Sequence, residues 1–232
     1  LREAGVTELL LLPMFPHHAQ ATTETALKHA YKEMKAMSWK PKTIEMGHFP
    51  TDENYINPLA KSIESHLTED THLLYSYHGL PVSHVKRIDA SKKHCQKAAD
   101  CCSVSCSANE LCYGRHCMET SIAVSEKLGL PADRWSLSFQ SRLGPVKWLT
   151  PSTTDKVKEL VERGVRDLAI VAPAFLADGL ETLEELDMGI REEFEEMGGE
   201  RLTVIKCLND DPDWILGLSE MVEGKFRASA PA

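Results

Sequence analysis

The chain has 232 residues, of which 42% are hydrophobic and 26% charged, a composition typical of a globular protein with a sizeable core. Its formal net charge of −9 argues against a nucleic-acid partner, because phosphate binding needs clustered Lys and Arg. No apolar run approaches the roughly 20 residues that cross a bilayer, so we predict no transmembrane segment. The chain opens at Leu1, and we expect that an N-terminal part is missing.

The cysteines are concentrated in one segment. Six of the seven lie between Cys95 and Cys117, whereas disulfide frameworks distribute cysteines over a small secreted chain. A dense group in an otherwise cysteine-poor chain is typical of metal binding in a reducing compartment. We therefore predict a cytoplasmic protein.

The first part of the chain alternates apolar runs with amphipathic stretches. Four leucines form a run typical of a buried strand, which Pro13 ends. Thr22 or Thr23 is expected to cap the next helix, and Pro58 is expected near the start of a second one, a position that proline tolerates. The predicted elements are strands at 9–12 and 43–46 and helices at 22–34 and 57–67.

The second part continues the alternation. Gly129 and Gly164 follow two amphipathic stretches as preferred helix terminators. Strands that alternate with helices predict an α/β fold with parallel sheets covered on both faces. The predicted elements are strands at 73–77, 135–139, 168–171 and 202–205, and helices at 118–128, 152–163, 181–197 and from 211 onward.

A break at Asp70 divides the predicted elements into two units. Residues 1–70 supply only two strands, so we expect the later part of an α/β lobe that is truncated at its N-terminus. Residues 71–232 supply four strands and form a second lobe, with a cysteine-rich insert at about 95–112.

Chemically active side chains follow several predicted strands. Ligands of parallel α/β sheets bind beyond the carboxyl ends of the strands. Histidines, aromatic side chains, an arginine and carboxylates occur at these ends, in segments 13–18, 77–81, 139–142 and 173–181. We therefore expect the functional site at this edge.

His78 is the first candidate. A neutral imidazole can accept a proton or bind a metal near pH 7. Gly79 and Pro81 predict a fixed turn after it. The alternative is a strand-end histidine that only binds a neighbouring carbonyl.

Glu181 and Glu185 are the second candidates, because a spacing of four places them on one helix face. The alternative is a solvated acidic face, since acids favour a first helical turn. Arg142 follows another strand and could bind a carboxylate with both arms of its guanidinium. Phe139 and Trp148 offer flat apolar surface for an aromatic ring.

These motifs, in this order, resemble the ferrochelatase family. The resemblance rests on segments 76–81, 138–145, 148–153 and 173–185, supported by 16–23 and 207–210. It implies two similar Rossmann-like lobes with a porphyrin cleft between them. It also implies an enzyme that inserts Fe2+ into a porphyrin, with protoporphyrin IX expected, to form haem.

The resemblance assigns site residues by position. The active-site histidine of the family falls on His78, its glutamate on Glu181 and the next acid of its helix on Glu185. A further acid would fall at Gly189, where this sequence departs from the family. The expected substrate contacts are Arg142, Phe139, Gln140, Ser141, Trp148 and Phe15.

The chemistry of metal insertion suits these residue types. A porphyrin loses two pyrrole protons as Fe2+ enters. His78 could accept a proton, Glu181 could accept one or hold the ion, and Glu181 and Glu185 could replace its waters stepwise. Two alternatives stay open: a chelatase of the same fold for another metal or tetrapyrrole, and a non-catalytic sensor that binds haem or a cluster.

The cysteine-rich insert has three interpretations. Some ferrochelatases carry a 2Fe–2S centre, in some bacterial members within an internal segment of this kind, and such a cluster needs four thiolates. The others are a zinc site and disulfides or free thiols. Cys117 matches the ordinary family segment and is expected to be structural. The favoured ligands are Cys95, Cys102, Cys106 and Cys112, with Cys101 as a substitute.

Overall fold

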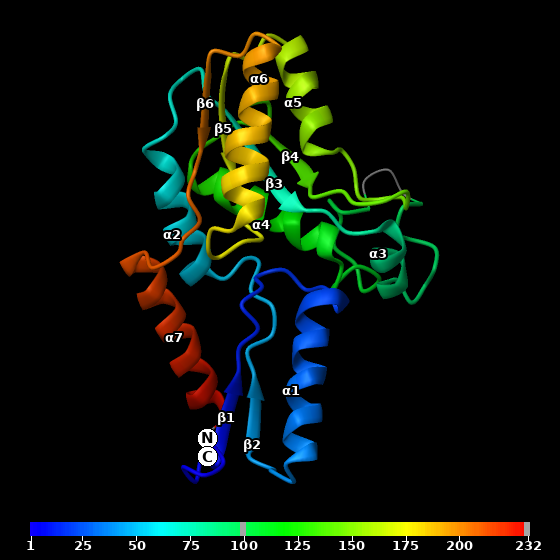
Figure 1. Cartoon of the computed structure of the whole chain (residues 1–232), viewed down its shortest axis with the longest axis vertical. Helices are drawn as coiled ribbons and strands as arrows, with labels where there is room; N and C mark the ends of the chain where they lie inside the picture. Colours follow the sequence, from blue (N-terminus) through cyan, green and yellow to red (C-terminus); the bar gives the residue numbers. More distant parts are fainter. Residues whose placement is uncertain (98–100, 230–232) are drawn as a thin grey trace.

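Two parallel sheets form the framework of the protein (Figure 1). The computed structural model describes residues 1–97 and 101–229. The strands are β1 (Glu8–Leu11), β2 (Lys42–Glu45), β3 (His72–His78), β4 (Trp135–Gln140), β5 (Asp167–Val171) and β6 (Arg201–Val204). The smaller sheet pairs β1 with β2, and the larger has the order β4-β3-β5-β6.

Helices connect the strands and confirm the predicted α/β class. Two segments with the wider i→i+5 hydrogen bonding of a π-helix, η1 (Gln20–Glu24) and η2 (Glu181–Ile190), lead directly into α-helices. The α-helices are α1 (Thr25–Ala36), α2 (Glu53–Glu64), α3 (Val82–Ile88), α4 (Tyr113–Lys127), α5 (Thr153–Glu162), α6 (Arg191–Glu196) and α7 (Pro212–Ser229).

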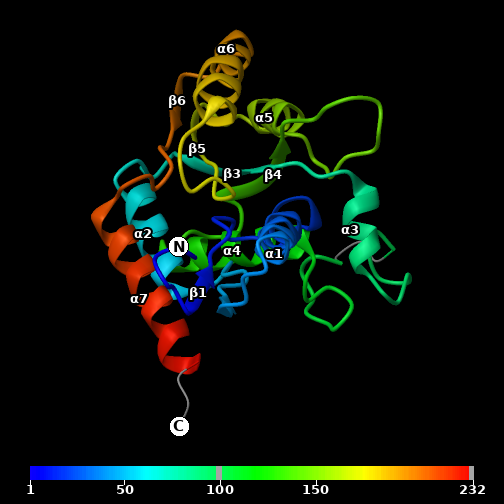
Figure 2. The ribbon, with the colours of Figure 1, turned by 60° about the horizontal axis from the view of Figure 1, so that its bottom comes forward.

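The larger sheet is covered on both faces, as Figures 1 and 2 show. Successive side chains of a strand point to opposite faces. Leu74 and Ile170 join a buried cluster with side chains of α5, η2 and α6. Tyr75 and Ala169 join a second cluster with side chains of α2, α4 and α7. The core of the protein therefore lies on both sides of β3 and β5.

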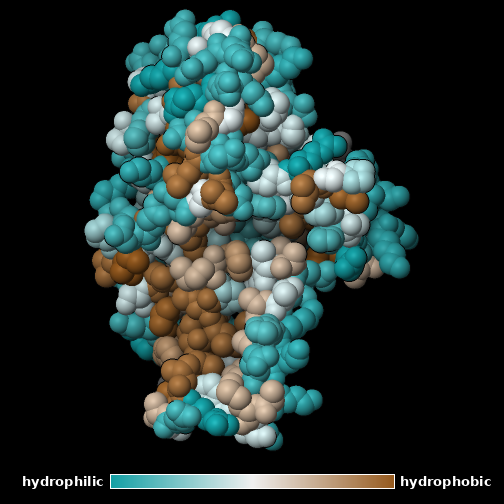
Figure 3. Space-filling view, viewed as in Figure 1, coloured by the Kyte–Doolittle hydropathy of each residue, from teal (hydrophilic) through white to brown (hydrophobic). Residues whose placement is uncertain are grey.

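β1 is less buried than its leucine run predicts. Leu9, Leu10 and Leu11 are half-buried, because β1 pairs with β2 along one edge and no other strand pairs with it among the described residues. Figure 3 shows hydrophobic side chains gathered on the lower half of the view, where Figure 1 places β1 and α7. The sequence therefore predicted the strand, but its leucines are less buried than expected.

α2 begins earlier than the sequence predicted, and its interior proline faces α7. α2 begins at Glu53, not near Pro58, because the side chain of Asp52 accepts a hydrogen bond from the backbone N–H of Asn54 (3.0 Å). Pro58 lies inside the helix and has no N–H to bond the Asn54 carbonyl. Gly217 of α7 packs there, and a Cβ at this glycine would lie 2.4 Å from that carbonyl oxygen.

Other helix boundaries also differ from the prediction. The first helical segment begins at Gln20 after Ala19, so neither predicted threonine cap is used. α4 begins at Tyr113, five residues before the predicted start, and α3 was not predicted. Residues 98–100 of the cysteine-rich insert lie outside the described residues.

α7 returns from the larger sheet to the smaller one (Figure 1). Its end lies beside β2, where Nζ of Lys42 donates a hydrogen bond to the carbonyl of Ser229 (2.8 Å). The expected division at residue 70 falls between α2 and β3, and it stays a prediction. No described helix has both the length and the apolar character needed to cross a membrane.

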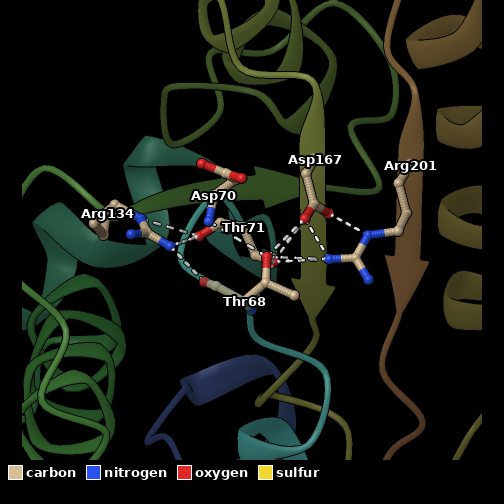
Figure 4. Close-up of polar contacts among 6 residues, drawn as sticks. All are labelled: Thr68, Asp70, Thr71, Arg134, Asp167 and Arg201. Atoms are coloured by element: carbon tan, nitrogen blue, oxygen red, sulfur yellow. Dashed lines mark hydrogen bonds and ion pairs between the residues drawn. The ribbon is translucent and has the colours of Figure 1, made fainter.

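A polar network joins the strands of the larger sheet at their amino ends (Figure 4). Asp167 accepts hydrogen bonds from the hydroxyl of Thr71 (2.8 Å) and from Nε of Arg201 (2.9 Å). Arg134 donates to the carbonyls of Thr68 (2.8 Å) and Thr71 (2.7 Å). Burial raises the pKa of Asp167, but the hydrogen bonds from Arg201 and Thr71 outweigh it and hold this pKa below its ordinary value. This edge is opposite the predicted site.

Candidate functional site

His78 is the last residue of β3 and is half-buried at the carboxyl edge of the larger sheet. Its Nδ1 lies 2.7 Å from the carbonyl oxygen of Gly79. A carbonyl can only accept, so Nδ1 carries the hydrogen and Nε2 of the neutral ring has a free lone pair. The ring lies 6.1 Å from that of Phe175, centroid to centroid. The arrangement suits a base whose orientation is fixed by its own turn.

The turn after His78 depends on a glycine. The N–H of Gly79 donates to the carbonyl of Gln140 (2.8 Å), and a Cβ at Gly79 would lie 2.8 Å from that oxygen and 3.2 Å from the ring of Trp148. The indole N–H of Trp148 donates to the carbonyl of Leu143 (2.9 Å). Trp148 therefore closes the loop after β4 onto the His78 turn.

The acidic candidates lie on η2, which continues from the segment after β5. Glu181 and Glu185 are half-buried, whereas Glu184 is exposed. The prediction assumed an α-helical face, but the segment has π-helical hydrogen bonding, which occurs frequently at functional sites. Oε2 of Glu181 is near Gly179, whose added Cβ would lie 3.2 Å from it.

Gln140 anchors the start of η2. This side chain is buried, and its Nε2 donates to the carbonyl of Glu181 (2.8 Å). Its Oε1 accepts a hydrogen bond from the hydroxyl of Ser76 (2.8 Å), which also lies 2.8 Å from the hydroxyl of Thr153. The structure therefore places Gln140 in an internal network rather than at a surface open to a substrate.

Ser141 and Glu185 bind each other directly. The backbone N–H and the hydroxyl of Ser141 donate to the two carboxylate oxygens of Glu185, each at 2.6 Å.

Phe139, expected to offer a flat surface, is only 6% exposed and packs in the core. Ser138 and Gln140 beside it are also buried, because both faces of this end of β4 are covered.

Exposed side chains lie in the loops that follow β1 and β4 and at the start of η2. Arg142 is exposed in the loop after β4, and Phe15, in the loop after β1, is 37% exposed. The large hydrophobic side chains left open in the loop after β4 and at the start of η2 are Leu143, Val146, Leu180 and Leu183.

Asp178 organises the approach to η2, a role that the sequence analysis did not assign. Its carboxylate accepts hydrogen bonds from Nδ2 of Asn209 (2.8 Å), the backbone N–H of Cys207 (3.1 Å) and the hydroxyl of Thr182 (3.1 Å). Burial raises the pKa of Asp178, but these bonds outweigh it and lower the pKa overall. The sequence offered one signal for this role, which is that Asp178 is an acid in the segment that follows β5.

Four thiols of the cysteine-rich insert converge at the N-terminus of α4. Cys112 precedes its first residue, and the nearby thiol of Cys102 lowers the pKa of Cys112. The sulfur atoms of Cys102 and Cys101 are 3.9 Å apart. Cys95 is close enough to Cys101 and Cys112 for their charges to raise its pKa, although burial contributes most. The convergence brings together donors that are up to 17 residues apart in the sequence.

The N-terminus of α4 favours a thiolate at Cys112. The hydrogen bond from Cys102 lowers its pKa most, and the backbone N–H groups of Arg115 and Gly114 lower it further against the effect of burial. Packing here is close, since a Cβ at Gly114 would lie 3.2 Å from the sulfur of Cys102.

Cys106 lines a different cavity from Cys101 and Cys102. Its sulfur is 3.7 Å from Nε2 of His94, and it lines a cavity of about 1110 Å³ together with His48 and Glu119. Cys101 and Cys102 line a different cavity, of about 660 Å³. Cys117 is fully buried in the core. Within residues 1–97 and 101–229, no group of three or more His, Cys, Asp or Glu side chains is already arranged to hold a metal ion.

Comparison with known proteins identifies relatives across nearly the whole chain. A family model described as Ferrochelatase matches residues 1–226. The ferrochelatase of Pseudomonas fluorescens (strain Pf0-1) is 38% identical over 222 residues, 95% of this chain and 65% of its own length. That of Bdellovibrio bacteriovorus is 36% identical over 225 residues, 96% of this chain and 66% of its own length. The chain thus spans just under two thirds of these curated relatives.

Solved structures with little sequence similarity have the same fold. SirB from Bacillus subtilis with Fe3+ has a TM-score of 0.59 at 12% identity and covers 97% of this chain and 73% of its own. The sirohydrochlorin chelatase SirB from Bacillus subtilis subspecies spizizenii, in complex with cobalt, has a TM-score of 0.60 at 8% identity, with coverage of 98% and 73%.

Proposed function

Since the chain belongs to the ferrochelatase family, we propose that the whole protein inserts Fe2+ into a porphyrin and forms haem. Protoporphyrin IX is the proposed substrate. Two pyrrole N–H bonds break and two protons leave, while Fe2+ gives up water ligands and forms bonds to all four pyrrole nitrogens. Fe2+ and the porphyrin are both substrates.

His78 is the proposed base. Its Nδ1–H is committed to the Gly79 carbonyl at 2.7 Å, so Nε2 is the nitrogen that accepts a pyrrole proton. The position of His78 at the carboxyl edge of the sheet, with Nδ1 held by its own turn and Nε2 left to face a substrate, is the observation that carries the proposal.

Glu181 is the proposed partner of His78. Its half-buried carboxylate lies at the start of η2 and accepts the second proton or binds the incoming ion. Carboxylates exchange for the waters of a hydrated divalent cation. Glu185, on the same segment, is a further proposed iron ligand, and its bonds to Ser141 also make it an anchor of the loop after β4.

The porphyrin is proposed to lie in a cleft between the lobe of residues 1–70 and that of residues 71–232. Leu143, Val146, Leu180 and Leu183 are exposed at the site and offer apolar surface to the macrocycle. Arg142 is exposed in the same loop and is the proposed partner of a propionate. Phe15 and Trp148 are further proposed contacts. The burial of Phe139 and Gln140 restricts them to holding the site in place.

Anaerobic assay of the full-length protein with protoporphyrin IX and Fe2+ tests the proposed function. We expect haem formation, its loss in His78→Ala, and normal turnover in His29→Ala, which removes an exposed histidine of α1. Turnover with Co2+ or Ni2+ but not with Fe2+ would instead indicate a different chelatase. Stoichiometric porphyrin binding without turnover would indicate a sensor.

We also propose that the converging thiols hold a 2Fe–2S cluster. Cys95, Cys101, Cys102 and Cys112 supply the four thiolates that such a cluster needs. This set contains Cys101 in place of Cys106, which was favoured from the sequence, because Cys106 lines a different cavity. When bound, the cluster would supply one-electron chemistry and order the segment. Such thiols need a reducing compartment, and the cytoplasm is the proposed location.

Metal analysis of anaerobically purified full-length protein tests the cluster. We expect two irons and two labile sulfides per chain, as in any 2Fe–2S centre. Cys101→Ser should lose iron, whereas Cys106→Ser and Cys207→Ser should retain it. Stoichiometric zinc without labile sulfide would support the zinc alternative, and iron loss in Cys106→Ser alone would restore the ligand set predicted from sequence.

A further inference from the structure

The side chain of Tyr113 contacts the backbone of the proposed base, His78. The hydroxyl of this tyrosine donates to the carbonyl oxygen of His78 at 2.8 Å. Tyr113 is the first residue of α4 and is 7% exposed. Its ring packs edge-on against the buried ring of His17, with centroids 6.0 Å apart. The hydroxyl is therefore held in place from within the core.

The His78 carbonyl lies where the sheet has lost a strand. β5 pairs with β3 only as far as Tyr75, whereas β4 continues alongside to His78. The N–H groups of Leu73 and Gly79 donate toward β4, to Arg134 and Gln140. Because peptide groups of a strand alternate in direction, the His78 carbonyl points to the side on which β5 has already ended. Tyr113 supplies the donor that a continued strand would have given.

The same tyrosine adjoins the converging thiols. Cys112 precedes it, and the next residue, Gly114, packs against the sulfur of Cys102, which a Cβ at Gly114 would approach to 3.2 Å. The first turn of α4 therefore touches the cysteine-rich insert on one side and His78 on the other. A displacement of this turn moves the hydroxyl that holds the end of β3.

We propose that Tyr113 is a positioning residue, which fixes His78 through its carbonyl and couples the placement of this base to the order of the cysteine-rich insert. The inference rests on the proposed function of His78 as a base. Misplacement of a reacting group by about 1 Å can lower a rate by about 100-fold. The loss of one hydroxyl that holds the strand end is therefore expected to lower kcat about tenfold.

Tyr113→Phe in the full-length protein tests this role, with Tyr77→Phe as the matched control. The hydroxyl of Tyr77 is also buried and also bonds α4, at Ser121 (2.9 Å), but it does not touch the His78 carbonyl. We expect kcat to fall about tenfold in Tyr113→Phe with the porphyrin KM within about twofold, and near-normal kcat in Tyr77→Phe. Unchanged kcat in Tyr113→Phe, or equal losses in the two variants, would overturn the proposal.

Amide hydrogen exchange of the substrate-free protein gives a second readout. The N–H of Gly79 bonds Gln140, so its exchange reports how firmly the end of β3 is held. We expect faster exchange at Gly79 in Tyr113→Phe and in Cys112→Ser, no further increase when the two are combined, and no change in Cys207→Ser. Unchanged exchange in Tyr113→Phe would overturn the positioning role, and additive increases would overturn the coupling. Full activity of His78→Ala would instead reject the proposed base, while leaving the exchange result interpretable.

Discussion

Ser141 binds the carboxylate of Glu185 with both its backbone N–H and its hydroxyl, at 2.6 Å each. The two residues are 44 positions apart and join the loop after β4 to η2. Ser141 has a φ of 60°, in the left-handed region that glycine favours. The paired hydrogen bonds hold the serine in this conformation, so the loop that carries Arg142 depends on Glu185.

This contact predicts that Ser141→Ala and Glu185→Gln alter the same kinetic parameter. Each variant weakens the link between the loop and η2, so we expect the porphyrin KM to rise about three- to tenfold, the effect of losing roughly 1 kcal/mol of hydrogen bonding. Steady-state kinetics with each substrate varied in turn provides the measurement. A higher KM for Fe2+ in Glu185→Gln alone would show that Glu185 acts as an iron ligand instead.

Glu181→Gln is expected to impair metal insertion more than Glu184→Gln. Glu181 is half-buried beside Gly179, and Gln140 anchors its carbonyl, whereas Glu184 is exposed on the same segment. Removing the charge of Glu181 removes a proton acceptor or ion ligand, and we expect kcat to fall by about 100-fold or more. Glu184→Gln serves as the control, with kcat within about twofold. Equal losses would contradict this difference in role.

Gly217→Ala is expected to destabilise the protein, whereas Gly224→Ala is not. A Cβ at Gly217 would lie 2.4 Å from the Asn54 carbonyl oxygen, so α7 would have to move away from α2 at a cost of about 1–3 kcal/mol. Gly224 lies in the same helix with no atom within 4 Å of an added Cβ. There, alanine should stabilise the helix by about 0.5–1 kcal/mol. Chemical denaturation of both variants decides the matter, and a stable Gly217→Ala protein would refute the predicted clash.

Asp167→Asn is expected to lower stability near pH 7 and to lose this effect in acid. Hydrogen bonds from Arg201 and Thr71 hold the pKa of Asp167 below its ordinary value. A depressed carboxyl pKa contributes stability that is fully present above the unfolded-state value of about 3.9 and is lost as pH falls through the folded-state value.

The expected difference between wild type and Asp167→Asn is roughly 1–2 kcal/mol at neutral pH. Urea denaturation across pH 7 to pH 3 measures it. Asp213→Asn, which removes an exposed ion pair with Lys61, should change stability little at any pH. A difference for Asp167→Asn that stays constant down to pH 3 would contradict the linkage.

Local sequence was sufficient for the succession of strands along the chain and for the class of the fold. The apolar runs that predict strands near 73–77 and 168–171 match β3 and β5, because a fully buried parallel strand needs a nearly continuous apolar run. The strand-end rule likewise located His78 and the segment before Glu181 at the carboxyl edge of one sheet.

The starts of helices were harder to predict from the sequence, because they depend on single side-chain contacts. The α2 boundary is set by Asp52, whose carboxylate bonds Asn54, and its interior proline is tolerated where Gly217 packs. The π-helical hydrogen bonding of η2 was also hidden. Two acids four residues apart also fit an α-helix, so the spacing of residues alone does not distinguish a π-helix from an α-helix.

Contacts between distant residues were decided only by the tertiary structure. The sequence by itself determined that six cysteines lie close together in the chain, whereas the tertiary structure placed Cys101 and Cys102 at one cavity and Cys106 at another. The bonds from Tyr113 to His78 and from Ser141 to Glu185 join residues 35 and 44 positions apart. Periodicity reports which face of an element is buried, but a hydrogen bond between two elements depends on where packing places their ends.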